Sequence, residues 1–190
     1  MGDNRGYSLN KAGIRYVREM MQSDNMYVKE APEAQIRHYL GINEILIRLI
    51  EAGVQREDIV WLSTAEATDY LSRLLEAHGE KIDRRRLIRP DARAVINRTA
   101  FWIEFDNSTE RTRKLERKFY EYVHALTLVQ NKDPVVWVAA NRNRKEYLAN
   151  QWEAVKKVNY EDRVDIPEMC FFVEGEELSF LESRSGLVTS

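Results

Sequence analysis

The chain has 190 residues, of which 44% are hydrophobic and 32% are charged, and its formal net charge is −2. This length and composition predict one globular domain, or a domain with a small appendage, and they exclude a disordered or low-complexity chain. The small negative charge excludes binding to nucleic acid through overall basicity, so a nucleic-acid partner would have to be bound by local basic patches.

Hydrophobic periodicity predicts mainly helices in the first part of the chain. Ser8 and Thr64 are suitable N-caps, Pro32 can open a helix and Gly53 can end one. These signals predict, in chain order, a helix over 8–22, a helix between Pro32 and Gly53, a strand over 58–62 and a helix over 64–78.

Most strands of a sheet are predicted in the second part of the chain. The patterns predict strands over 91–97 and 100–106, a helix over 109–128, a strand over 134–140 and a helix over 143–157. The tail predicts a hairpin, with strands over 169–173 and 178–181 joined at Glu174-Gly175. The predicted fold class is therefore α/β, with a mixed central sheet that contains an antiparallel hairpin and is flanked by helices.

Three carboxylates lie near the ends of the two strands 91–97 and 100–106, which only Asn97-Arg98-Thr99 separates. If the loop is Asn97-Arg98, Asp91 lies opposite Glu104, and if it is Arg98-Thr99, Asp91 lies opposite Asp106. In both registers the three carboxylates share one face of the sheet. A three-residue loop would instead place Asp91 on the opposite face.

Carboxylates that share a face repel one another, so the register predicts a cation among them. A divalent cation with a preference for oxygen ligands, Mg²⁺ or Mn²⁺, is one candidate, and a nearby lysine or arginine is the other. The metal ligands would be Asp91, Glu104 and Asp106.

Two basic patches flank the acidic strands in the sequence. Each patch alone is also compatible with an ordinary solvated surface. Because they lie on both sides of the acidic cluster, we predict that they bind DNA. The residues assigned to this role are Arg84, Arg85, Arg86, Arg89, Arg111 and Lys114.

Other chemistries lack the residues they need. The histidines, at 38, 78 and 124, have no metal-ligand spacing, and there is no glycine-rich phosphate-binding loop. The single cysteine, Cys170, excludes an intrachain disulfide and lies in an apolar run. No apolar run is long enough to span a membrane, and together with the cysteine usage this indicates a cytoplasmic protein.

The order of elements, with Pro90-Asp91 opening the hairpin and Glu104-Phe105-Asp106 ending it, resembles the PD-(D/E)xK, or restriction-endonuclease-like, nuclease core. The resemblance implies that the acids bind a metal ion and position the attacking water. This chain has Asp106 where that family has a lysine. Lys118, on the following helix, is the candidate replacement, so the catalytic residues of an active enzyme would be Asp91, Glu104, Asp106 and Lys118.

A second set of motifs covers most of the chain and consists of Tyr7-Ser8-Leu9 with Lys11 and Gly13, His38-Tyr39-Leu40 with Ile42-Asn43, Trp61, Arg89-Pro90-Asp91, Glu104-Phe105-Asp106 with Thr109, and Lys118 with Tyr122. In this order and spacing, these motifs have a resemblance to the replication-relaxation family. The resemblance implies a role in plasmid replication, DNA relaxation or mobilisation, with DNA and other replication or mobilisation proteins as partners. It also implies an N-terminal helical segment over 1–30, similar to the end of a winged helix, before a nuclease-like α/β domain over 31–190.

Three functional hypotheses follow. The first is a DNA-binding accessory protein of a plasmid or mobile element that does not itself cleave DNA. The second is an active, metal-dependent DNA nuclease, and the third is a protein-interaction scaffold whose acids pair only with neighbouring arginines. The sequence leaves open whether the protein forms a homo-oligomer.

Overall fold

The structure is a computed structural model that describes residues 33–83, 87–108, 112–161, 163 and 165–187. Residues 1–40 and 41–190 form two compact units. Within the first unit, the described residues are the beginning of α2 (Glu33–Glu51). The predicted helix over 8–22 and the segment over 1–30 lie outside the described residues.

In the described part of the chain, five strands form one mixed sheet in the order β1-β2-β3-β4-β5. The pairs β1/β2 and β2/β3 are antiparallel, whereas β3/β4 and β4/β5 are parallel. The predicted mixed sheet with an antiparallel hairpin is confirmed. The strands are β1 (Ile59–Ser63), β2 (Ala92–Ile96), β3 (Thr99–Asp106), β4 (Val135–Ala139) and β5 (Met169–Val173), and a short 3-10 turn, Arg56–Asp58, precedes β1.

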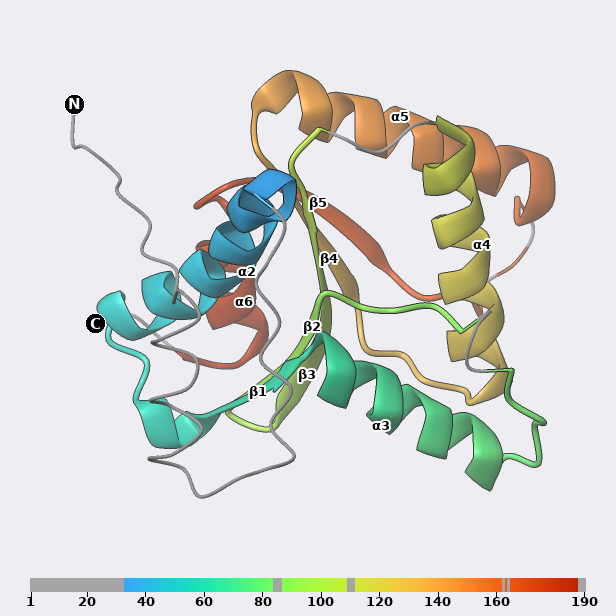
Figure 1. The fold of residues 1–190 in the computed structure, drawn as a ribbon, viewed down its shortest axis with the longest axis horizontal. Helices are drawn as coiled ribbons and strands as arrows, with labels where there is room; N and C mark the ends of the chain where they lie inside the picture. The colour runs from blue at the N-terminus through green and yellow to red at the C-terminus, as the bar shows by residue number, and fades with distance from the viewer. Residues whose placement is uncertain (1–32, 84–86, 109–111, 162, 164, 188–190) are drawn as a thin grey trace. The chain divides into compact units, whose positions relative to one another are not determined.

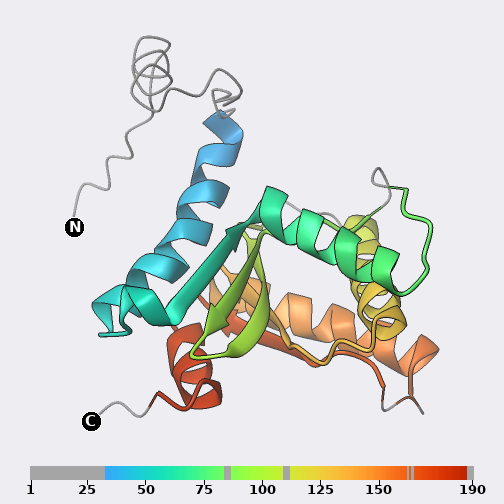
Figure 2. The same ribbon diagram turned by 90° about the horizontal axis from the view of Figure 1, so that it is seen from below.

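Helices cover both faces of this sheet (Figures 1 and 2). On one face lie α3 (Thr64–Ala77), α4 (Thr112–Leu128) and α5 (Arg142–Asn159), whose apolar residues pack with Trp102 and Trp137. On the other face, residues 41–51 of α2 and helix α6 (Glu177–Arg184) pack against Phe101, Ile103 and Phe105. None of the helices in the described residues is both long and apolar enough to span a membrane.

A two-residue turn at Asn97-Arg98 sets the register of the hairpin. Both residues have positive φ, 44° and 70°, which a tight hairpin turn of this length requires and which asparagine tolerates. Ile96 pairs with Thr99 and Ala92 with Ile103, so Asp91 lies opposite Glu104. The first of the two predicted registers is therefore the one that forms.

The predicted hairpin in the tail is wrong. The strand over 169–173 forms as β5, but residues 177–184 form α6 instead of a second strand. Leu178 and Leu181 are three residues apart, which suits a helix, and glutamate and leucine favour that conformation. Burial also holds the helix in place, because Leu181 is completely buried and packs against the same face of the sheet as Phe101.

The helices that follow the strands all begin at the same end of the sheet. The carboxyl ends of strands β1, β3, β4 and β5 all lie here, and antiparallel β2 begins here. We call this end of the sheet the carboxyl edge. Helices α3, α4, α5 and α6 each begin just after one of those strands. Such an edge is the usual place for a ligand site in an open α/β sheet.

Candidate functional site

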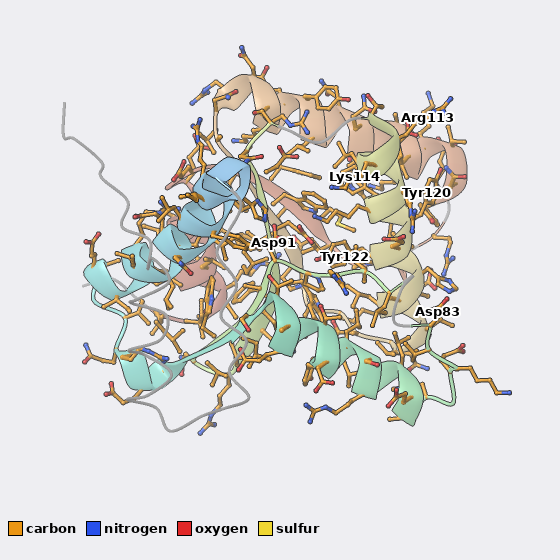
Figure 3. The ribbon with its side chains drawn as sticks, in the orientation of Figure 1. Asp83, Asp91, Arg113, Lys114, Tyr120 and Tyr122 are labelled. Carbon is orange, nitrogen blue, oxygen red and sulfur yellow. The ribbon has the colours of Figure 1, made fainter. Side chains whose placement is uncertain are left out.

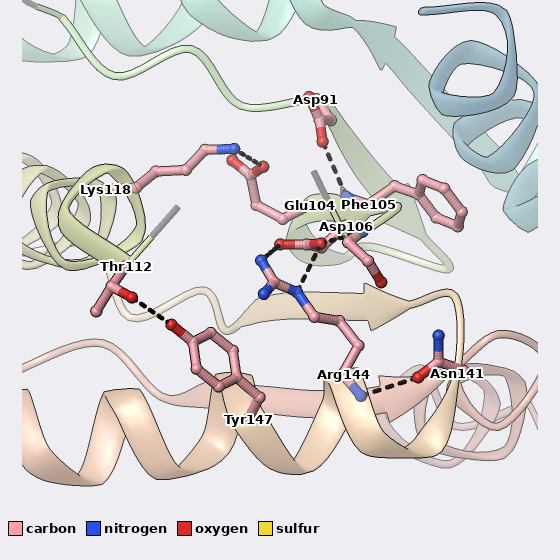
Figure 4. Close-up of polar contacts among 10 residues, drawn as sticks. Asp91, Glu104, Phe105, Asp106, Thr112, Lys118, Asn141, Arg144 and Tyr147 are labelled. Carbon is pink, nitrogen blue, oxygen red and sulfur yellow. Dashed lines mark hydrogen bonds and ion pairs between the residues drawn. The ribbon is translucent and has the colours of Figure 1, made fainter. Parts of the chain in front are cut away.

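The predicted acidic residues lie together at the carboxyl edge (Figure 4). Asp91 immediately precedes β2, and Glu104 and Asp106 are at the end of β3. Glu104 contacts α4 and Asp106 contacts α5, so both side chains lie on the face that these helices cover. All three are buried, and we call them the acidic pocket.

Glu104 is completely buried and has hydrogen-bonding partners on both oxygens. Lys118 Nζ lies 2.5 Å from Oε2, and the Tyr122 hydroxyl donates to Oε1 at 2.5 Å. Burial raises the pKa of Glu104 well above its usual range, although Lys118 opposes the shift. Burial and Glu104 likewise raise the pKa of Tyr122, so its hydroxyl stays protonated and donates.

Asp106 forms a forked ion pair with Arg144 of α5. Arg144 Nε donates to Oδ1 at 3.0 Å and Nη2 donates to Oδ2 at 2.8 Å, while the Ser108 backbone N–H also donates to Oδ1 at 2.6 Å. Asn141 caps α5 by accepting from the Arg144 backbone N–H. The Arg144 guanidinium lies 4.8 Å from the centre of the Tyr147 ring, which helps to orient it.

Asp91 is held in place by the backbone of the neighbouring strand. Its Oδ2 accepts from the Phe105 N–H at 2.8 Å, and its own carbonyl accepts from the Thr64 hydroxyl at 2.7 Å. Its charge contributes to the raised pKa of Glu104. Asp91 therefore joins the hairpin to the start of α3 and acts electrostatically on the centre of the acidic pocket.

Of the basic residues predicted to bind DNA, the structure describes two, Arg89 and Lys114. Arg84, Arg85, Arg86 and Arg111 lie outside the described residues. Arg89 is exposed and lines a pocket of about 350 Å³ beside α3, together with Thr64, Thr68 and Ser72. Lys114 is exposed on α4, on the same side of that helix as Tyr122 (Figure 3).

Arg93, which follows the first basic patch in the sequence, is not available to a partner. It is 5% exposed, and its guanidinium lies between the rings of Tyr70 and Trp102, 4.5 Å from each centre. Asp133 pairs with it at 2.8 Å. Trp102 is also completely buried.

The functional residue that the sequence analysis missed is Arg144. It lies 38 residues after Asp106, at the start of the predicted helix over 143–157. The only signal in the sequence is the basic run Arg142-Asn143-Arg144-Lys145 after an apolar strand. That run does not reveal which of its side chains turns toward the sheet.

Comparison with known proteins identifies the family. The family model described as replication-relaxation matches residues 2–136, which is well over half of the chain. The chain belongs to the replication-relaxation family. No curated protein and no solved structure matches it. The family suggests a role in plasmid replication or DNA relaxation, and its match covers the acidic pocket and Lys118 but ends before Arg144.

In this replication-relaxation protein the acidic pocket does not fit the predicted Mg²⁺ or Mn²⁺ ion. Among the described residues, no group of three or more His, Cys, Asp or Glu side chains is arranged to hold a metal. The oxygens of Glu104 already accept from Lys118 and Tyr122, and those of Asp106 accept from Arg144. A metal would have to displace these donors.

Proposed function

We propose that the protein is a DNA-binding accessory protein of plasmid replication, DNA relaxation or mobilisation, and that it does not cleave DNA itself. The observation that carries the proposal is the internal pairing of the acidic pocket: Glu104 with Lys118, and Asp106 with Arg144. Family membership supplies the process.

The pairing favours DNA binding because it reduces repulsion of phosphate. Counted with all three carboxylates ionised, the acidic pocket carries three negative charges, and Lys118 and Arg144 reduce this total to one. The cations that remain exposed near this edge, such as Arg89 and Lys114, then contribute more to the local field. The same pairing disfavours cleavage, since the carboxylate oxygens are engaged by the protein's own donors.

Titration of a fluorescent DNA duplex by anisotropy tests the proposal. We expect affinity to fall steeply between about 50 and 200 mM salt, with a slope of about −0.9 per phosphate contact. The triple variant Arg84→Ala, Arg85→Ala, Arg86→Ala and the double variant Arg89→Ala, Lys114→Ala should both flatten the slope. The matched control is Lys157→Ala, an exposed cation at the far end of α5. Absence of binding at low salt would favour the protein-interaction scaffold.

Active metal-dependent cleavage is the second candidate, and one distance favours it. A lysine on α4 can replace the missing family lysine only if it reaches the acids, and Lys118 Nζ lies 2.5 Å from Glu104. Incubation of supercoiled plasmid with Mg²⁺ or Mn²⁺ separates the two candidates. We expect no cleavage; cleavage by purified protein that disappears in Asp91→Ala would establish the nuclease instead.

A further inference from the structure

The pair between Asp106 and Arg144 is the feature of the acidic pocket that departs furthest from a metal site. The Asp106 side chain is 3% exposed and that of Arg144 is 12% exposed, so both charges are largely removed from water. The two parallel N–H donors match the two carboxylate oxygens, which is the strongest geometry for such a pair. While it persists, Asp106 cannot turn its oxygens toward another cation.

The charges and positions of the three carboxylates indicate which kind of ion Arg144 replaces. Glu104 and Asp106 lie two residues apart on one face of β3, and Asp91 lies opposite Glu104. Lys118 and Arg144 leave this set with one negative charge. Without Arg144 two negative charges would remain, which equals the charge that a divalent cation neutralises.

We propose that Arg144 is a built-in counter-ion that excludes divalent cations from the acidic pocket. Its guanidinium occupies Asp106 in place of a metal ion, so that the pocket stays folded, with only one negative charge left over, in the absence of a metal. This inference concerns the non-cleaving part of the proposed function, and it holds or fails whether or not the protein binds DNA.

Calorimetric titration with Mn²⁺ alone, in the absence of DNA, tests the proposal on the full chain. We expect no saturable binding by the wild type. Arg144→Met, which removes the charge but keeps much of the volume, should show saturable binding, with a Kd at least about tenfold below the highest Mn²⁺ concentration at which the wild type shows none. Arg144→Lys retains a cation, so it should show no saturable binding, like the wild type. Arg144→Met with Asp106→Asn removes the ligand as well and should lose the gain.

Thermal unfolding with and without Mn²⁺ provides a second readout that does not depend on activity. Mn²⁺ should raise the midpoint of Arg144→Met and leave that of the wild type unchanged. If Arg144→Met does not fold in metal-free buffer, Mn²⁺ should restore its folded state, and adding Asp91→Asn should abolish the rescue. Saturable binding by the wild type that Asp91→Asn removes, or an Arg144→Met variant indifferent to Mn²⁺, would overturn the proposal.

Discussion

Replacing Lys118 with methionine removes the cation from a carboxylate that has no access to water. Glu104 is completely buried, and after the change only the Tyr122 hydroxyl would remain of its two close donors. Breaking a buried ion pair by removing one partner costs about 3–5 kcal/mol, because the remaining charge is uncompensated. The Lys118 side chain is 17% exposed, so water screens the pair in part, and we expect a loss of about 3 kcal/mol.

Urea denaturation followed by tryptophan fluorescence measures this loss as a change in the free energy of unfolding. The double variant Lys118→Met, Glu104→Gln removes both charges and should recover most of it. The matched control is Arg117→Met, one residue earlier, whose exposed pair with Glu121 on the same helix should contribute less than about 0.5 kcal/mol.

The raised pKa of Glu104 also predicts the direction in which the free energy of unfolding changes with pH. The pKa of Glu104 is raised in the folded state, so the folded protein binds its proton more tightly than the unfolded chain does. The stabilisation from that proton is fully present below the unfolded value of about 4.5 and is lost as pH rises through the folded value. Stability relative to Glu104→Gln should therefore fall as pH rises above 4.5, and the penalty of Lys118→Met should shrink as pH is lowered.

A loss below about 1 kcal/mol for Lys118→Met near neutral pH would refute the reasoning, because it would mean that the pair is effectively solvated. A double variant that is as unstable as the sum of the two single changes would refute it equally.

Three further predictions test the packing around the site. Leu115→Ala should cost about 2–5 kcal/mol in urea denaturation, since this α4 residue is completely buried, and an unchanged midpoint would contradict its place in the core. Gly41→Ala should cost about 1–3 kcal/mol because the added Cβ would lie 2.2 Å from the Phe105 ring, whereas Asn43→Ala, exposed on the same helix, should stay within about 0.5 kcal/mol. Burial raises the pKa of the Cys170 thiol to about 12, so an aromatic disulfide reagent should label it on the order of 100-fold more slowly in the folded protein than in urea; equal rates would show that the thiol is accessible.

Local sequence signals were sufficient wherever a segment's own pattern decides its structure. The helices and strands from α2 to α5 form close to their predicted ranges because each has one clear period of apolar residues. The pairing of Asp91 across the hairpin could also be limited to a few registers, since the turn must lie within Asn97-Arg98-Thr99. The structure has the register in which Asp91 lies opposite Glu104. The tail could not be predicted in the same way, because the short run from Leu178 to Leu181 fits two periods and packing decides between them.

The pairing of the carboxylates depended on contacts between residues distant in sequence. Lys118 was the candidate replacement for the missing lysine, and it contacts Glu104. Its position on α4 follows from the apolar stripe of Leu115 and Phe119. Arg144 was not predicted. Its contact with Asp106 depends on the cap at Asn141 and on the rotation of α5 about its axis, which no local pattern specifies.

The residue at position 106 and the residue at position 144 have to be considered together. The end of β3 projects its side chain toward the start of α5, where Arg144 approaches within 2.8 Å of Asp106. A lysine at 106, as in the nuclease family that the hairpin resembles, would bring two cations together in a buried place and repel by several kcal/mol. With Arg144 present, an acid is the residue that this position can accommodate. Asp106 is therefore better understood as half of an ion pair than as a damaged catalytic motif, and the nuclease-like pattern should be read together with α5.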